Sequence, residues 1–99
     1  MRKNIVAGNW KMNLNRDQGI KLVEEVISLI SSDNNVEVVF SPSFLYLHKV
    51  NKMCDNNNLL QTASQNISHN ESGAFTGEVS AQMVNSLNVK YTILGHSER

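Results

Sequence analysis

Short apolar runs alternate with longer amphipathic stretches along this chain. Runs rich in β-branched residues predict strands at 5–8, 36–40, 59–63 and 90–94. Stretches with apolar residues at steps of three and four predict helices at 16–30, 44–53 and 80–87. The pattern therefore predicts strands and helices in strict alternation, beginning and ending with a strand.

Local signals mark several of the element ends. Asn15 can cap the first helix, and Gln18 three residues later completes a capping box. The polar segment 31–35 is expected to end that helix. Asn88 stands where a left-handed residue after the third helix is expected.

The alternation favours parallel strands joined by right-handed crossovers. The strands are nearly continuous in apolar character, as is typical when both faces of a sheet are covered. Two architectures satisfy this pattern, an open doubly wound sheet and a (β/α) barrel. Periodicity alone does not choose between them.

Composition excludes some classes of protein. The chain has 99 residues, no net charge, and 40% hydrophobic residues, so a nucleic-acid binder is not expected. No segment approaches the ~18 apolar residues of a membrane span, and the apolar run at the start is too short for a signal peptide. Cys54 is the only cysteine, which fits a reducing compartment. We therefore expect a cytoplasmic protein that does not bind membranes.

Polar residues of catalytic type follow the first and fourth predicted strands. Asn9 and Lys11 come after the first, and His96 and Glu98 come after the fourth. Parallel strands bring both groups to one edge, where active sites of α/β proteins lie. A lysine can stabilise negative charge and an imidazole can donate to a carbonyl oxygen, which suits proton transfer beside a carbonyl.

Other chemistry has no support in the sequence. His48 and His69 are expected to be surface residues, and no spacing of ligand residues indicates a metal site. The glycines form neither GxGxxG nor a P-loop. We expect no cofactor.

Four motifs resemble segments of the triosephosphate isomerase family. They are Gly8–Asn13 (GNWKMN), Gln65–Ser68 (QNIS), Gly73–Ser80 (GAFTGEVS) and Tyr91–Arg99 (YTILGHSER). Together they cover essentially the whole chain, in order. The resemblance implies a (β/α)8 barrel, which needs about 250 residues. Residues 1–99 would then be a partial barrel domain, the N-terminal portion with about four strands and three helices.

The resemblance also implies an activity and roles for residues. The family interconverts dihydroxyacetone phosphate and D-glyceraldehyde 3-phosphate through an enediol, in glycolysis and gluconeogenesis. Asn9 and Lys11 would bind the substrate, with Lys11 supplying positive charge. His96 would be the electrophile, acting as a neutral imidazole as this family is known to do. Glu98 would order Lys11 and His96.

The family is a homodimer, in which the third loop docks beside the active site of the partner. By this resemblance the loop Gly73–Val79 would make that contact. Thr76 would approach the partner's site, and Glu78 would pair with Arg99 of the partner subunit. Met12, beside the substrate-binding motif, is also expected at the dimer contact.

The resemblance assigns the catalytic base to a glutamate after a sixth strand, which is not among these 99 residues. The chain is therefore expected to be an incomplete fragment, inactive alone, with its first and fourth strands left as open edges. Two alternatives stay open. One is a truncated paralogue that acts as a non-catalytic interaction module, and the other is a different phosphate-binding barrel enzyme.

Overall fold

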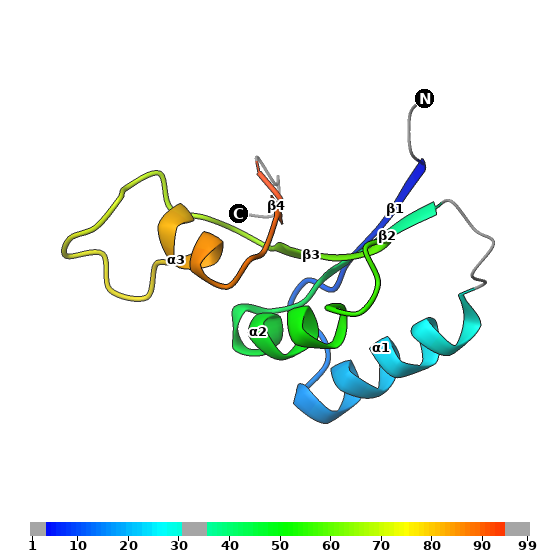
Figure 1. Ribbon diagram of the computed structural model, residues 1–99. Helices are drawn as coiled ribbons and strands as arrows, with labels where there is room; N and C mark the ends of the chain where they lie inside the picture. Colours follow the sequence, from blue (N-terminus) through cyan, green and yellow to red (C-terminus); the bar gives the residue numbers. More distant parts are fainter. Residues whose placement is uncertain (1–3, 31–35, 95–99) are drawn as a thin grey trace.

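The computed structural model describes residues 4–30 and 36–94 of the chain. These residues form four strands and three helices in strict alternation (Figure 1). The strands are β1 (Asn4–Asn9), β2 (Val36–Ser41), β3 (Leu60–Ser64) and β4 (Tyr91–Thr92). The helices are α1 (Arg16–Leu29), α2 (Phe44–Met53) and α3 (Ala81–Ser86). The predicted alternation is confirmed.

The strands are parallel and lie in the order β1-β2-β3-β4. Asn9 pairs with Ser41 at the carboxyl end of the first strand pair, and Ser64 pairs with Thr92 at the far edge. An open doubly wound sheet reverses its strand order and carries helices on both faces. Here the order never reverses, and right-handed crossovers then place every helix on one side of the sheet. The sheet is therefore a segment of a barrel wall.

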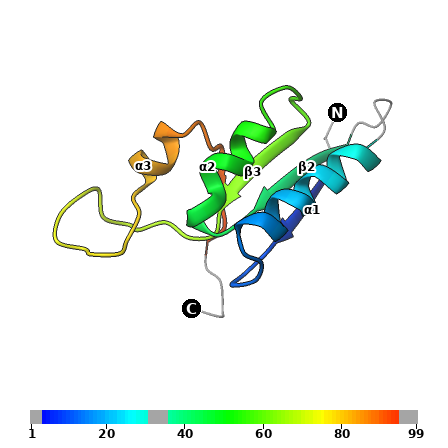
Figure 2. The same ribbon diagram turned by 90° about the horizontal axis from the view of Figure 1, so that it is seen from below.

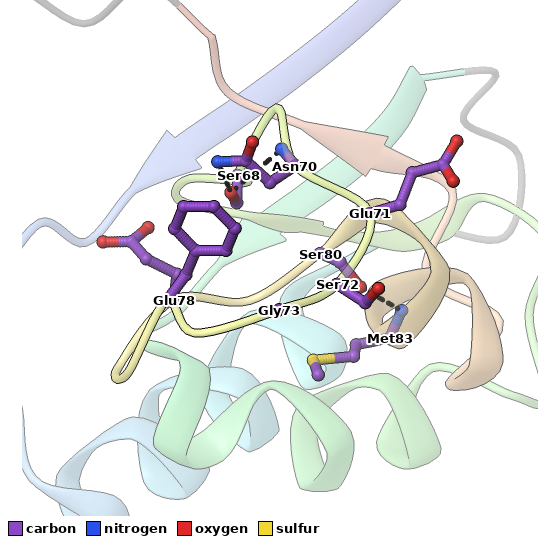
Figure 3. A pocket seen from close by; sticks show the side chains of 9 residues that line it. Ser68, Asn70, Glu71, Ser72, Gly73, Glu78, Ser80 and Met83 are labelled. Carbon is purple, nitrogen blue, oxygen red and sulfur yellow. Dashed lines mark hydrogen bonds between the residues drawn. The ribbon is translucent and has the colours of Figure 1, made fainter.

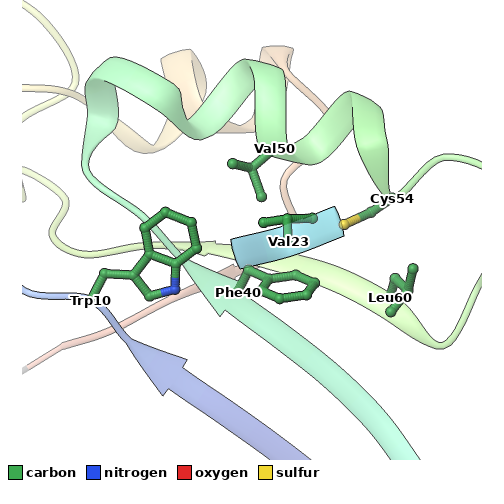
Figure 4. Close-up of a cluster of buried hydrophobic side chains, with 6 residues drawn as sticks. All are labelled: Trp10, Val23, Phe40, Val50, Cys54 and Leu60. Atoms are coloured by element: carbon green, nitrogen blue, oxygen red, sulfur yellow. The ribbon is translucent and has the colours of Figure 1, made fainter. Parts of the chain in front are cut away.

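The main core lies between the sheet and α1 and α2, which lie side by side below the strands in Figure 1 and on the viewer's side of them in Figure 2. Figure 4 shows its buried members, which come from the loop after β1, from α1, from β2, from the end of α2 and from β3. They are Trp10, Val23, Phe40, Val50, Cys54 and Leu60. Burial of these apolar groups is what holds α1 and α2 against β2 and β3.

A second cluster joins α3 to the rest of the fold. Leu47 of α2 packs with Val84 of α3 and with Val89. Beside it, the buried Asn51 side chain accepts from the Thr62 hydroxyl (2.6 Å) and donates to the carbonyl of Leu87 (2.7 Å). One side chain of α2 thus ties β3 to the end of α3.

The predicted helix ends are confirmed where the structure describes them. Asn15 and Gln18 form the reciprocal capping box at the start of α1. Asn88 has a φ of 64°, the left-handed conformation expected after α3. The polar segment 31–35, expected to end α1, lies outside the described residues.

Two predictions about the strands need correction. All six residues of β1 are exposed, with Ile5 at 53% and Val6 at 59%. The cover on both faces that its apolar character predicts is therefore absent, whereas the open edge expected of a partial barrel is present in the described residues. The reason is its position at the edge of the sheet, where β2 is its one neighbour in the described part of the chain. β4 spans only two residues rather than the five predicted, at the other edge.

Candidate functional site

The loop after β1 carries the first two candidate site residues. Lys11 has a φ of 57°, which side chains other than glycine rarely adopt. Its backbone N–H donates to Oδ1 of Asn9 (3.0 Å), and the Asn13 side chain donates to the carbonyl of Trp10 (3.0 Å). The Asn9 side chain therefore helps to fix the backbone turn that places Lys11.

Gln65 lies directly after β3, outside the loop that follows β1, and its side chain hydrogen-bonds to that loop. Its side-chain nitrogen donates to the carbonyl of Lys11 (2.8 Å) and to the carbonyl of Ser41 (3.0 Å). Ser41, at the end of β2, also accepts from the backbone N–H of Trp10 (3.2 Å). Three strand ends are thus joined around the backbone of Lys11.

The sequence pattern did not single out Gln65, although Gln65 lies in one of the four motifs that resemble the family. A signal was available, because Gln65 is a polar residue immediately after a strand, the same criterion that selected Asn9 and His96. The sequence does not show which strands lie side by side in the sheet. That order brings Gln65 to Lys11, which is 54 positions away in the sequence.

The parallel strands bring Asn9, Lys11 and Gln65 to one edge, as predicted for Asn9 and Lys11. The chain just after β4 stays paired with the end of β3 at this edge, because the N–H of Ile93 donates to the carbonyl of Ser64 (2.9 Å). His96, Glu98 and Arg99 lie outside the described residues.

The residues expected at the dimer contact that the structure describes are exposed. The segment between β3 and α3 projects away from the sheet as a long loop in Figures 1 and 2. Thr76 and Glu78 lie in this loop, which closes at its base where Ser68 donates to the carbonyl of Val79 (2.7 Å). Met12, in the loop after β1, is 99% exposed.

Figure 3 shows a pocket within this projecting loop and the start of α3. Glu71 and Glu78 lie on opposite sides of it, and Ser80 caps α3 by accepting from the N–H of Met83 (3.2 Å). Neither Asn9 nor Lys11 lines this pocket. It belongs to the projecting loop and is separate from the edge that carries the candidate site.

One ionisable pair lies on the face of the sheet away from the helices. The Tyr91 hydroxyl donates to Oε1 of Glu37 (2.8 Å), and this hydrogen bond is the main reason that the pKa of Tyr91 is raised. Glu37 is buried at 6% exposure. Because side chains alternate along a strand, Glu37 points away from the helix-facing Phe40. The pair therefore lies on the inner side of the barrel wall.

Cys54 is not a candidate nucleophile. Burial raises the pKa of its thiol to about 11, with a smaller contribution from the neighbouring Asp55. The reactive form of cysteine is the thiolate, which this environment disfavours. Cys54 is a core residue.

Within residues 4–30 and 36–94, no three or more His, Cys, Asp or Glu side chains are placed to hold a metal ion. None of the helices in the described part of the chain is long and apolar enough to cross a bilayer.

Comparison with known proteins decides the family. A family model described as triosephosphate isomerase matches residues 4–99. The chain belongs to the triosephosphate isomerase family. The strands and helices described above are therefore part of the (β/α)8 barrel of this family, as the resemblance implied.

Curated relatives in this family carry the same name, triosephosphate isomerase. The protein of Clostridium novyi (strain NT) is 52% identical over 99 residues, which are 100% of this chain and 39% of the relative. That of Phocaeicola vulgatus is 47% identical over 100 residues, again 39% of the relative. That of Clostridium botulinum (strain Eklund 17B) is 46% identical over the same shares. The chain thus spans about two fifths of the length of these relatives.

Proposed function

We propose that this chain is part of a triosephosphate isomerase, which interconverts dihydroxyacetone phosphate and D-glyceraldehyde 3-phosphate through an enediol intermediate. Family membership supports the reaction, because relatives named for it match the entire chain. The observation that carries the proposal is the position of Lys11. Its backbone is held at the carboxyl edge of the sheet by hydrogen bonds at both its N–H and its carbonyl.

In this proposal Asn9 and Lys11 bind the substrate. A phosphorylated triose carries negative charge, and more develops on its oxygens when a proton leaves the carbon beside the carbonyl. A cation fixed in advance stabilises that charge without reorganising during the reaction. The hydrogen bonds that restrain the Lys11 backbone supply this preorganisation.

Two residues further along the chain than β4, His96 and Glu98, are proposed to complete this half of the site. His96 is proposed as the electrophile, which donates a hydrogen bond to the substrate oxygen and so favours the enediol. Glu98 is proposed to order Lys11 and His96 by charge and hydrogen bonding. Both follow β4, and the carboxyl ends of all four strands lie at the same edge of the sheet as Asn9.

We also propose that the enzyme is a homodimer built through the loop Gly73–Val79. The exposure of Thr76 and Glu78 in a projecting loop supports this, as does the nearly complete exposure of Met12. An apolar side chain in water gains free energy when a partner covers it. Arg99 is the proposed partner of Glu78 across the dimer.

Residues 1–99 are proposed to form one partial domain that supplies the substrate-binding side of the site. They span 39% of the length of the relatives, so we expect the 99-residue chain by itself to be inactive. A glycolytic role supports the cytoplasmic location that we propose. Cys54 is the single cysteine among these 99 residues and is a buried free thiol, which is in keeping with a reducing compartment.

The test is a hybrid enzyme in which residues 1–99 of this chain replace the aligned residues of the Clostridium novyi relative. We expect it to convert D-glyceraldehyde 3-phosphate to dihydroxyacetone phosphate with a kcat/KM within about tenfold of the parent, a barrier change of roughly 1.4 kcal/mol. A folded hybrid that binds no phosphorylated triose and shows no turnover would contradict the proposal and favour an interaction module.

A further inference from the structure

Gln65, directly after β3, joins the Lys11 loop to the end of β2. An amide nitrogen carries two hydrogens, and both are used here, one on the carbonyl of Lys11 and one on that of Ser41. The side chain is therefore held in one position by its own hydrogen bonds.

Lys11 needs such restraint because of its backbone. A left-handed conformation at a residue with a side chain persists only where the surroundings fix it. Asn9, the last residue of β1, bonds the N–H of Lys11, so this bond ties the loop only to the strand that it follows. Gln65 bonds the carbonyl of Lys11 from β3, and so ties the loop to the sheet.

We propose that Gln65 is a positioning residue that acts through Lys11. It fixes the backbone of Lys11 against the end of β2, and thereby the place from which the ammonium meets an anionic substrate. This inference rests on the proposed function of Lys11 in substrate binding. It adds a residue whose contribution to binding depends entirely on the presence of the lysine.

The variant is Gln65→Met, which keeps the length of the side chain and removes both donors. Gln61→Met is the matched control, because Gln61 is also on β3 but donates only to the nearby carbonyl of Asn58 (3.2 Å). Both are made in the hybrid enzyme, and sn-glycerol 3-phosphate serves as a non-reactive phosphorylated probe. If Gln65→Met does not fold, Gln65→Glu replaces it, since a carboxylate has no donor for the two carbonyls.

A double-mutant cycle with Lys11→Met separates positioning from a general structural role. We expect Gln65→Met to weaken binding of the probe about tenfold when Lys11 is present, and less than about twofold in the Lys11→Met background. Gln61→Met should leave binding unchanged in both. Equal weakening in the two backgrounds would overturn the proposal, because Gln65 would then act independently of Lys11.

A second readout does not depend on turnover. In a sample labelled with ¹³C at lysine carbonyls, the Lys11 resonance reports the hydrogen bond from Gln65 directly. Gln65→Met should shift it, and Gln61→Met should not. An unmoved Lys11 carbonyl would refute the positioning role even if the hybrid is an active isomerase, and a shifted carbonyl in an inactive hybrid would refute the proposed function alone.

Discussion

The indole ring of Trp10 lies directly over Gly19 of α1. A Cβ atom placed on Gly19 would lie 2.7 Å from Cζ3 of Trp10, closer than real contacts allow. Trp10 is 8% exposed and directly follows β1, so the missing side chain at position 19 lets the loop after β1 close onto the helix. This contact connects the core to the loop that carries Lys11.

The first prediction concerns this contact. Gly19→Ala should destabilise the hybrid enzyme by about 1–2 kcal/mol, because overpacking outweighs the roughly 1 kcal/mol that alanine gains in a helix. Urea unfolding measures the change. In a Trp10→Leu background, which removes the ring, the same substitution should be neutral or stabilising. A stabilising effect in the presence of Trp10 would contradict the close packing.

The second prediction concerns the buried Asn51. Asn51→Ala leaves the Thr62 hydroxyl and the Leu87 carbonyl without their partner in the core. We expect a loss of about 2–3 kcal/mol in the free energy of unfolding, given the cost of unpaired buried polar groups. Asn85→Ala, on the exposed side of α3, is the control and should change stability by less than about 0.5 kcal/mol.

The third prediction is a pH dependence. The hydrogen bond to Glu37 raises the pKa of Tyr91 above its ordinary value of 10.0. A group whose pKa is raised on folding stabilises the fold fully below its unfolded pKa and loses that contribution as the pH rises through the folded pKa. Tyr91→Phe should therefore be destabilising at pH 8, and the difference from the unaltered protein should shrink above pH 10.

The same pair allows a direct titration. Ultraviolet absorbance of tyrosinate should show Tyr91 titrating at higher pH than a tyrosine in an unfolded peptide. Glu37→Gln, which removes the charge but keeps an acceptor, should lower that titration point. If it does not move, Glu37 is not the main cause of the shift.

The hydrophobic pattern of this chain predicts the order of its elements because each local signal agrees with the tertiary fold. The α2 boundaries at Phe44 and Met53 and the capping box at Asn15 were readable since they depend only on neighbours in sequence. The exposure of Ile5 in β1 could not be predicted from local apolar character, because burial depends on what lies beside an edge strand. It was expected only from the resemblance to a barrel, which leaves the first strand at an open edge. The short length of β4 likewise reflects its position at an edge of the described sheet.

The candidate site also has residues that the sequence predicts and residues that only the structure shows. Asn9 and Lys11 could be selected from their position after a strand, and the role proposed for them comes from the resemblance of the motif. The hydrogen bonds of Gln65 to Lys11 and Ser41 required the lateral order of three strands, which no local pattern encodes. Long-range side-chain contacts of this kind are the part of a site that a single sequence leaves undetermined.

The most direct test of the central claim compares two lysines in the hybrid enzyme. Lys11→Met removes the charge at the carboxyl edge of the sheet, whereas Lys21→Met removes an exposed charge on α1. If Lys11 stabilises the charge that develops on the triose, kcat/KM for D-glyceraldehyde 3-phosphate should fall at least about 100-fold with Lys11→Met, a loss of roughly 2.7 kcal/mol, and stay within about twofold with Lys21→Met. Equal kcat/KM values for the two variants would contradict the placement of the active site at this edge.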